Sequence, residues 1–318
     1  MQKIILDLDT GIDDTLAIAY ALGSPEVELI GITATYGNVT LEQGMRNDLA
    51  ITDLFGHSQV PVYPGLSHAS TKDSFTVLSG SAFIHGKNGI GDVEIPDSAR
   101  NAESENAVDF IIDAAHRYGE ELTYVATGPL TNIAAAIAKE PDIKNEIGKF
   151  VIMGGALTVS GNVAPWREAN ISQDPEAANA LFTSGAQVTM VGLDVTLQTL
   201  LTTKETQQWR DLHTAAGDFL SDMTDYYIRA YAKTSPKLGG CGLHDPLAVG
   251  VAIDPTLVKT LPINLKVDTE DPTRGRTIGD KDKLNDPHKT TQVAIGIDVN
   301  RFLSEFMSRI SALAEGKR

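Results

Sequence analysis

The sequence predicts an α/β fold, with a mostly parallel open sheet and helices on both faces. Short apolar runs, typical of buried parallel strands, alternate along the chain with patterns typical of helices. Polar, glycine-bearing turns follow several of these runs, and open α/β sheets carry their sites at the carboxyl ends of the strands. Neither a break in composition nor a linker divides the chain. We therefore expect a single large domain over residues 1–318 with a Rossmann-like core.

The first predicted strand (residues 3–6) and the first predicted helix (residues 16–22) enclose an acidic stretch. It holds four carboxylates, which are Asp7, Asp9, Asp13 and Asp14. Neighbouring carboxylates repel one another, and a hard divalent cation with oxygen ligands supplies the counter-charge that they need. The preference for acids at a helix N-terminus explains the last two residues but not the first two. The stretch therefore predicts a metal site.

Two known motifs begin in a similar way. An EF-hand loop requires glycine at its sixth position and glutamate at its twelfth, but counting from Asp7 these positions hold Ile12 and Ile18. A haloacid-dehalogenase-type phosphatase also begins with a strand and Asp-x-Asp, and usually has threonine or valine where this chain has Gly11. The EF-hand is excluded, whereas the phosphatase stays open as a rival interpretation.

The next three elements continue the alternation of strands and helices. Residues 27–35 are a predicted strand, 41–55 a helix and 60–65 a short strand. Asn38 follows the first of these strands and so lies at a carboxyl end, beside the acidic stretch if the two strands are neighbours. An asparagine in an ordinary turn is the alternative.

Periodicity fades between residues 67 and 101, which are rich in Gly, Ser, Asp and Pro. Irregular stretches of this length within a domain are usually functional loops or mobile segments. His85 lies among glycines in this stretch, where its side chain either contacts a substrate or faces solvent.

The middle of the chain repeats the logic of the first motif. A helix at 107–117 precedes a strand at 122–126, and a glycine turn leads from Thr127 into a helix at 133–139. Thr127 is therefore at the carboxyl end of a strand, where its carbonyl oxygen can serve as a neutral ligand of the kind that Ca²⁺ accepts.

A further strand and its glycine turn, at 150–155, open into a long loop at 161–170. The loop offers hydrogen-bonding groups that suit a vicinal diol, namely Asn162, Glu168 and Asn170. A loop that only faces solvent is the alternative. The next helix begins after Asp174, a suitable N-cap, with Pro175 in its first position.

A strand at 188–191 is followed by helices at 203–212 and 217–232. Tyr227 and Tyr231 are four residues apart in the second helix and share a face, which is more typical of core packing than of ligand contact.

The glycine-rich segment 239–242 gives the chain freedom to bring His244 and Asp245 to a site formed by other strands. An apolar helix follows, then predicted strands at 259–267 and 292–297 and a closing helix at 300–313.

The chain has 26 Lys and Arg against 42 Asp and Glu, a formal net charge of −16. This balance disfavours DNA, RNA and anionic membranes as partners and suits a small neutral substrate. Cys241 is the only cysteine, so no intrachain disulfide is possible. This suits a protein of a reducing compartment. The first motif begins at residue 7, which leaves no room for a signal peptide, and no apolar run is long enough to span a bilayer. We expect a cytoplasmic protein.

Together these motifs resemble those of the calcium-dependent inosine-uridine-type nucleoside hydrolase family. They follow the family's pattern over nearly the whole chain: Asp7-Leu-Asp9-Thr-Gly-Ile-Asp13-Asp14, Tyr36-Gly-Asn38, His85-Gly, Thr127-Gly-Pro-Leu-Thr-Asn132, Gly161-Asn162, Glu168-x-Asn170, Asp174-Pro-Glu176, His244-Asp245-Pro246 and Thr273-Arg-Gly-Arg-Thr277. Each motif alone is weak, but the set is highly specific. Two positions depart from the family: Thr10 stands where proline is common, and Ala169 where an aromatic residue is common.

The resemblance implies hydrolysis of the N-glycosidic bond of a ribonucleoside to free base and ribose. One Ca²⁺ would be held by Asp9, Asp14, Asp245 and the carbonyl of Thr127. Asp9 would be the general base for the attacking water, and His244 the acid that protonates the leaving base. Asp7 would support the metal, and the ribose would be bound by Asp13, Asn38, Asn162, Glu168 and Asn170. Further candidates for substrate binding are His85, Tyr227 and Tyr231, and the family's dimers and tetramers lead us to expect a homo-oligomer.

The chemistry is coherent without the resemblance. Breaking an N-glycosidic bond builds positive charge on the sugar, which a carboxylate-lined pocket stabilises, and an imidazole can protonate the departing base. Two alternatives stay open: a Mg²⁺-dependent phosphohydrolase with Asp7 as nucleophile, and a nucleoside-binding protein without catalysis. A binding protein has no need of both Asp9 and His244. The residues do not decide between purine and pyrimidine nucleosides.

Overall fold

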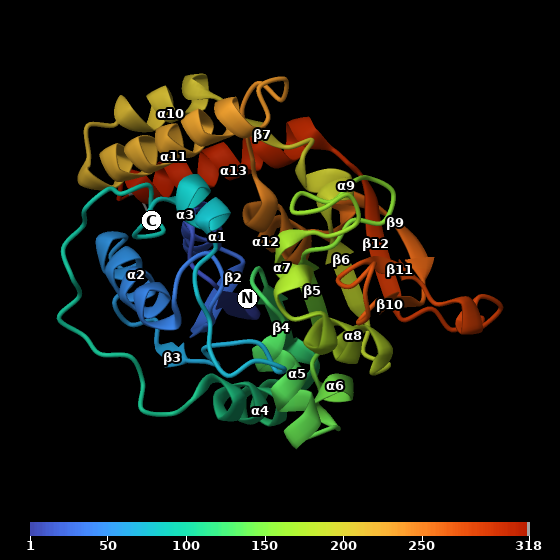
Figure 1. Ribbon diagram of the computed structural model, residues 1–318. Coiled ribbons are helices and arrows are strands. Elements are labelled where there is room, and N and C mark those ends of the chain that lie inside the picture. Colours follow the sequence, from blue (N-terminus) through green and yellow to red (C-terminus); the bar gives the residue numbers. More distant parts are fainter. Residues whose placement is uncertain (317–318) are drawn as a thin grey trace.

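The central sheet has eight strands in the order β3-β2-β1-β4-β5-β6-β12-β9 in the computed structural model, which describes residues 1–316 (Figure 1). In chain order the strands are β1 (Gln2–Leu8), β2 (Val27–Ala34), β3 (Val62–Pro64), β4 (Leu122–Ala126), β5 (Lys149–Met153), β6 (Val188–Val191), β9 (Val258–Ile263) and β12 (Thr291–Ile297). Neighbouring strands are parallel except for β12 and β9. The prediction of a mostly parallel sheet is confirmed.

The strand order reverses at β1. From β1 the chain moves outward through β2 to β3, then returns to the other side of β1 and continues through β4, β5 and β6. Such a reversal opens a crevice at the carboxyl ends of the strands, where ligands of open α/β sheets bind. β1 ends at Leu8, so Asp7 is the only carboxylate of the acidic stretch within the strand, and the stretch enters this crevice at Asp9.

Helices cover both faces of the sheet (Figure 1). One hydrophobic cluster joins the sheet to α1 (Ile12–Leu22), α2 (Leu41–Leu54), α10 (Thr203–Arg210), α11 (Ala215–Thr234), α12 (His244–Ile253) and α13 (Val299–Ala314). A second cluster joins the other face to α4 (Ala107–Tyr118), α5 (Thr131–Lys139), α6 (Ile143–Glu146) and α8 (Pro175–Thr183). β1 alternates between them, with Leu6 and Leu8 in the first and Ile5 in the second, which explains its uninterrupted apolar sequence.

Short elements complete the described chain. They are α3 (Ser79–His85), α7 (Ala169–Gln173), α9 (Leu193–Thr196), β7 (Leu200–Leu201), β8 (Cys241–Gly242), β10 (Leu265–Val267), β11 (Thr277–Gly279) and 3₁₀ turns at Gly119–Glu121, Pro255–Leu257 and Lys281–Lys283. None of the helices within residues 1–316 combines the length and the apolar character needed to cross a membrane.

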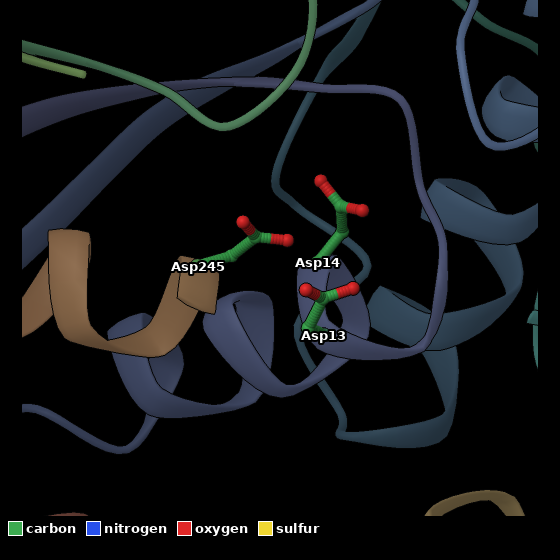
Figure 2. A group of neighbouring side chains, drawn as sticks. All are labelled: Asp13, Asp14 and Asp245. Atoms are coloured by element: carbon green, nitrogen blue, oxygen red, sulfur yellow. The ribbon is translucent and has the colours of Figure 1, made fainter. Parts of the chain in front are cut away.

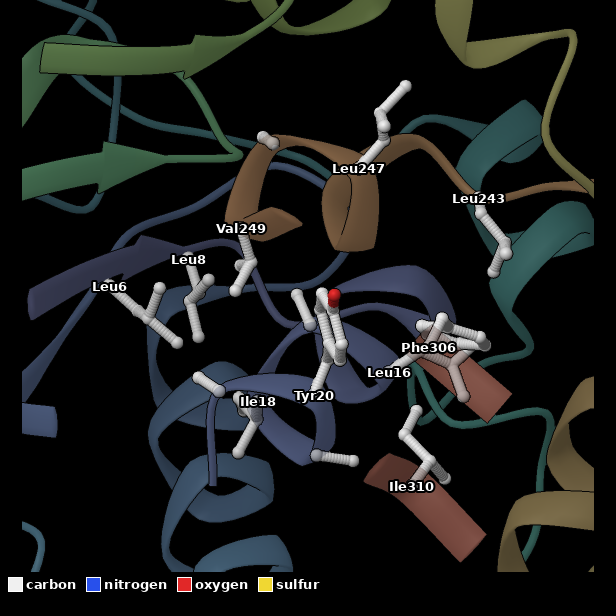
Figure 3. Packing of buried hydrophobic residues seen from close by; sticks show 14 of the residues in the cluster. Leu6, Leu8, Leu16, Ile18, Tyr20, Leu243, Leu247, Val249, Phe306 and Ile310 are labelled. Atoms are coloured by element: carbon white, nitrogen blue, oxygen red, sulfur yellow. The ribbon is translucent and has the colours of Figure 1, made fainter. Parts of the chain in front are cut away.

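α12 is an almost wholly buried helix that packs beside α1. Figure 3 shows Val249 of α12 close to Leu8 of β1, in the cluster that also holds Leu16 and Tyr20 of α1. Both helices begin at the carboxyl edge of the sheet, so this packing places their first turns next to each other. Residues that are more than two hundred positions apart thereby reach one site.

The expectation of irregular structure over residues 67–101 is wrong at α3, which spans Ser79–His85. A helix of seven residues is too short to show a helical period in the sequence. Its last residue, His85, is buried rather than solvated.

The expected strand at 259–267 is two strands in different sheets. β9 pairs with β12 in the main sheet, whereas β10 pairs with β11 in a separate two-stranded sheet. Asn264 lies between them and is buried; its side chain accepts a hydrogen bond from the N–H of Thr290 and donates one to the carbonyl of His288. These bonds to a distant loop fix the point where the chain leaves the main sheet.

Candidate active site

Two helix N-termini bring three carboxylates together at the carboxyl edge of the sheet. Asp13 and Asp14 are in the first turn of α1, and Asp245 is the second residue of α12 (Figure 2). Oxygen atoms of all three lie within 4.8 Å of one another, and all three side chains are buried. This three-carboxylate cluster contains Asp13, which the resemblance assigns to ribose, in place of Asp9, which it assigns to the metal.

Asp9 follows β1 directly and is fully buried. Its Oδ2 atom accepts a hydrogen bond of 2.7 Å from the backbone N–H of Asn38, which holds the carboxylate at the end of β2. The other oxygen, Oδ1, is buried and has no hydrogen-bond partner within residues 1–316. Because an unpaired buried acceptor is costly, this atom is suited to contact a bound cation or a water molecule.

Asp7 is tied to the strands and helix around it. Its Oδ1 atom accepts hydrogen bonds from the hydroxyl of Thr33 at 2.6 Å and from the side-chain amide of Asn132 at 2.8 Å. Burial raises the pKa of Asp7 to about 6. These contacts link β1 to β2 and to the first turn of α5, which fits a supporting position behind the three-carboxylate cluster.

Asp14 is held on both oxygens. Oδ1 accepts from the hydroxyl of Thr127 at 2.7 Å, and Oδ2 accepts from the N–H of Gly11 at 2.8 Å and from the amide of Asn38 at 3.3 Å. The carbonyl oxygen of Thr127 accepts from the amide of Asn170 at 2.5 Å, and as a carbonyl oxygen it has a second lone pair for another contact. Asn38, Thr127 and Asn170 are thus brought together around Asp14.

Negative charge gathers here without a cation from the chain. Burial raises the pKa of Asp9, Asp13, Asp14 and Asp245, and the charge of Asp14 raises the pKa of Asp9 and Asp13 further, that of Asp13 to about 7. Among residues 1–316, the only Lys, Arg or His side chain that contacts these carboxylates is His85, whose Nδ1 atom lies 3.8 Å from Asp13 Oδ1, and burial keeps that ring neutral by lowering its pKa to about 3. Buried, uncompensated, all-oxygen donors fit a hard divalent cation such as Ca²⁺ or Mg²⁺ better than zinc.

His244, the first residue of α12, has both ring nitrogens engaged. Nε2 lies 2.6 Å from the hydroxyl of Tyr231, and Nδ1 lies 2.7 Å from the hydroxyl of Thr196. Burial lowers the pKa of His244 to about 4, so the ring is neutral near pH 7. The ring of Tyr231 meets that of Tyr227 edge-on, with centroids 4.9 Å apart. The two tyrosines therefore share a face that points to the site, Tyr227 buried and Tyr231 half-buried.

His85 ends α3 beside the carboxylates. Its Nδ1 atom accepts a hydrogen bond of 3.1 Å from the N–H of Ile12, and its ring centroid lies 5.4 Å from that of Tyr227. Burial lowers the pKa of His85 to about 3, so the ring is a neutral acceptor. A Cβ atom on Gly11 would lie only 2.6 Å from Nδ1, which explains glycine at that position.

The diol-directed residues of the loop at 161–170 are not all brought together. Glu168 caps α7, and its carboxylate accepts from the N–H groups of Gly155, Asn170 and Ile171. Asn162 is exposed, and its side-chain oxygen accepts from the N–H of Ala169 instead of facing the carboxylates. Asn170 alone of the three contacts the site through Thr127.

Thr196 is a site residue that the sequence does not reveal. It ends α9, a helix of four residues after β6, and is fully buried against His244. No motif surrounds it in the sequence. The one available signal is its place after a predicted strand, at the same edge of the sheet as the other site residues.

Proteins similar to this chain are hydrolases of nucleosides. A family model described as inosine-uridine preferring nucleoside hydrolase matches residues 4–304. A solved structure of a purine-preferring ribonucleoside hydrolase from Gardnerella vaginalis is 74% identical, with a TM-score of 0.98 and 99% of each chain covered. The inosine-uridine preferring nucleoside hydrolase of Crithidia fasciculata is 37% identical over 305 residues, which cover 95% of each protein. Uridine nucleosidase 1 of Arabidopsis thaliana is 36% identical over 280 residues, which cover 88% of this chain and 82% of that protein.

Proposed function

Because the chain belongs to the inosine-uridine preferring nucleoside hydrolase family and is a hydrolase of N-glycosyl bonds, we propose that it cleaves purine ribonucleosides best, to free base and ribose. The main structural support is the placement of the unpaired Asp9 oxygen and the three-carboxylate cluster at the edge where His244 and Tyr231 also lie. The preference for purines rests on the 74% identical structure, which is described as purine-preferring.

Asp9 is the proposed general base. Its Oδ1 atom has no partner, and burial together with the charge of Asp14 raises its pKa, so its affinity for a proton is increased. It is suited to take the proton of the water that attacks the sugar. As the glycosidic bond breaks, positive charge develops on the sugar, and the carboxylates of Asp13 and Asp14 stabilise it.

The metal ligands are proposed to be Asp9, Asp14, Asp245 and the carbonyl of Thr127, and the cation to be Ca²⁺. Asp13 is a further candidate because its carboxylate lies in the three-carboxylate cluster. When bound, the cation would lower the pKa of water at the site and neutralise part of the carboxylate charge. The chain's own part is to hold these oxygens in fixed positions from the ends of β1 and β4 and the first turns of α1 and α12.

Ribose is proposed to be bound by Asp13, Asn38, Glu168 and Asn170. Asn162 is proposed to join them only after a movement of the loop at 161–170, because its side chain is exposed and accepts from the N–H of Ala169. Asn38 and Asn170 already contact Asp14 and the Thr127 carbonyl, so their remaining hydrogen-bonding capacity lies next to the proposed metal ligands. The Glu168 carboxylate binds backbone N–H groups, yet two oxygens with about four acceptor positions leave room for a hydroxyl.

His244 and Tyr231 are proposed to deliver a proton to the leaving base, with His85 and Tyr227 beside it. The hydroxyl of Tyr231 lies 2.6 Å from Nε2 of His244, so the two side chains form one path for a proton. The base receives its proton either from His244, once substrate displaces the tyrosine hydroxyl, or from the Tyr231 hydroxyl with His244 behind it.

A phosphohydrolase that uses Asp7 as nucleophile fits the geometry less well. Asp7 lies within β1, and its Oδ1 atom accepts two side-chain hydrogen bonds, from Thr33 and Asn132. Asp9, in contrast, lies beyond the end of the strand and accepts none from a side chain among residues 1–316. A homo-oligomer and a cytoplasmic location complete the proposal; they rest on the family resemblance and on the single, buried Cys241. Sedimentation velocity of the purified protein tests the first, and a dimer or tetramer is expected.

Free base released from a panel of nucleosides tests the function. We expect a higher kcat/KM for inosine and adenosine than for uridine, and poor turnover of the 2′-deoxy forms. Loss of a hydroxyl leaves buried polar partners unpaired, at about 1–3 kcal/mol each. Equal kcat/KM for inosine and deoxyinosine would contradict ribose recognition. Phosphate release from phosphomonoesters without any free base would favour the phosphohydrolase, and tight nucleoside binding without turnover the binding protein.

Removal of divalent cations by a chelator should abolish hydrolysis and lower Tm, and Ca²⁺ should restore both. A ligand present at about one hundred times its Kd stabilises the folded state by about 2.7 kcal/mol. Calorimetric titration of the metal-free protein with Ca²⁺, and separately with Mg²⁺, measures the affinity for each cation and the number of cation sites. Asp245→Asn should weaken binding, whereas Asp53→Asn, which removes a carboxylate of α2 that pairs with Arg100, should not. Full activity after chelation would contradict the metal site.

A further inference from the structure

One side chain of α2 joins the carboxylate turn (residues 9–11) to the glycine loop (residues 86–91). Asn47 is fully buried, and its Nδ2 atom donates to the carbonyl oxygen of Thr10 at 3.3 Å and to that of Asn88 at 2.8 Å. The first carbonyl belongs to the carboxylate turn and the second to the glycine loop. A single buried amide group thus bridges two segments that lie far apart in the sequence.

The glycine loop and His85 form one local unit. The N–H of Gly91 donates to the carbonyl of His85 at 2.8 Å, and the side chain of Asn88 accepts from two N–H groups that follow it. The loop also packs directly on the carboxylate turn, because a Cβ atom on Gly89, which has a positive φ of 82°, would lie 2.9 Å from the carbonyl oxygen of Thr10. A shift of the loop would therefore move His85.

α2 holds Thr10 in a second way. The carboxylate of Asp48, also fully buried, accepts from the hydroxyl of Thr10 at 2.5 Å. Gln43, one turn earlier in α2, donates to the side-chain oxygen of Asn47 at 2.9 Å, which leaves the amide nitrogen directed at the two carbonyls. Consecutive residues of α2 therefore fix both the hydroxyl and the carbonyl of Thr10. A proline at position 10 would have no hydroxyl for the first of these bonds.

We propose that Asn47 is a positioning residue, which holds His85 against the carboxylate turn and acts on the leaving base through it. The inference rests on the proposed function, in which His85 binds substrate. His85 is attached at its ring by the N–H of Ile12 and at its backbone through the glycine loop, and Asn47 secures the second attachment. Asn47 touches neither substrate nor metal in this role.

A double-mutant cycle tests whether Asn47 acts through His85. Asn47→Leu removes the amide at nearly constant size and should lower kcat/KM for inosine by ~10–100-fold, the loss expected when buried carbonyls lose their donor. His85→Ala should lower it at least as much. The double variant should be no worse than His85→Ala alone, because the second change has nothing left to act on. Losses that multiply in the double variant, or a parental kcat/KM in Asn47→Leu, would overturn the inference.

Hydrogen exchange gives a readout that does not depend on turnover. Amides of residues 86–91 should exchange ~10-fold faster or more in Asn47→Leu, while those of β4 keep the parental rate. Gln43→Leu is the matched control: it touches neither carbonyl, and Arg46 still donates to the Asn47 oxygen at 3.4 Å and keeps the amide oriented, so kcat/KM and exchange should stay near parental values.

The two proposals fail in different ways. If no nucleoside is hydrolysed, the proposed function fails. The role of Asn47 is then tested by hydrogen exchange alone, and unchanged exchange at residues 86–91 in Asn47→Leu would refute it. If Asn47→Leu does not fold, Asn47→Asp takes its place with the same expectations, because it keeps the shape and sets a carboxylate oxygen against the two carbonyls. Unchanged exchange in whichever variant folds contradicts the inference.

Discussion

Asparagine in place of Asp9 should abolish nucleoside hydrolysis while the fold survives, with a loss in kcat of at least ~10²–10⁴-fold. Asp9 Oδ1 is a buried carboxylate oxygen without a hydrogen-bond partner among residues 1–316, and it is proposed to take the proton of the attacking water. A side-chain amide cannot accept that proton. Asparagine has the same shape, and its oxygen can still accept from the N–H of Asn38, so the local structure should be kept.

Turnover of inosine and thermal unfolding without metal separate the possible causes of the loss. The metal-free variant should have a higher Tm than the metal-free parent, because burial and Asp14 raise the pKa of Asp9 and so make its charged form costly in the folded state. Asp53→Asn is the matched control at a half-buried position away from the site. Near-normal kcat would remove Asp9 as the base, and a lower Tm would show that the change acts through folding.

The sheet was predictable because its signals are local. Apolar runs such as that of β1, followed by glycine turns, mark strands that are buried on both faces, and their alternation with helices implies parallel pairing. The same logic identified the carboxyl ends of β1 and β4 as the edge that carries Asp9 and Thr127. The family and the hydrolase activity, inferred from the motifs, are confirmed by the comparisons.

The composition of the three-carboxylate cluster could not be predicted, because it depends on how two helices pack. The distance from Asp245 to Asp13 is set by the contact between α12 and α1, and sequence spacing contains no information about it. Glu168 illustrates a second limit. A carboxylate in a loop can bind a ligand or cap a helix, and only the position of α7 shows that Glu168 does cap one.

Burial of His85 is a third case of this kind. Its surroundings in the sequence are glycines and polar residues, which favour a solvated loop. The ring is buried because α3 packs on α11 and brings it against Tyr227 and the first turn of α1. Asn47 is hidden for the same reason, since nothing in a helical pattern distinguishes a buried asparagine that bridges two loops from one that faces solvent.

Alanine in place of His244 should lower kcat for inosine by ~10²–10⁴-fold and should spare p-nitrophenyl riboside. The base of a natural nucleoside is a poor leaving group as an anion and needs a proton, whereas p-nitrophenolate departs as a stable anion. His244 is neutral in its buried position, with Tyr231 at one nitrogen and Thr196 at the other, so any proton that it passes on must be replaced through these hydroxyls.

Two matched variants show which hydroxyl matters. Tyr231→Phe removes the partner of Nε2 and keeps the ring that packs against Tyr227, and Thr196→Val removes the partner of Nδ1 at constant shape. If Tyr231→Phe reproduces the selective loss on inosine, the proton reaches the base through Tyr231; if it does not, His244 donates directly. Thr196→Val should have the smaller effect on kcat, because Thr196 only orients the ring of His244. Equal losses on inosine and p-nitrophenyl riboside in His244→Ala would mean that His244 holds the site together and donates nothing.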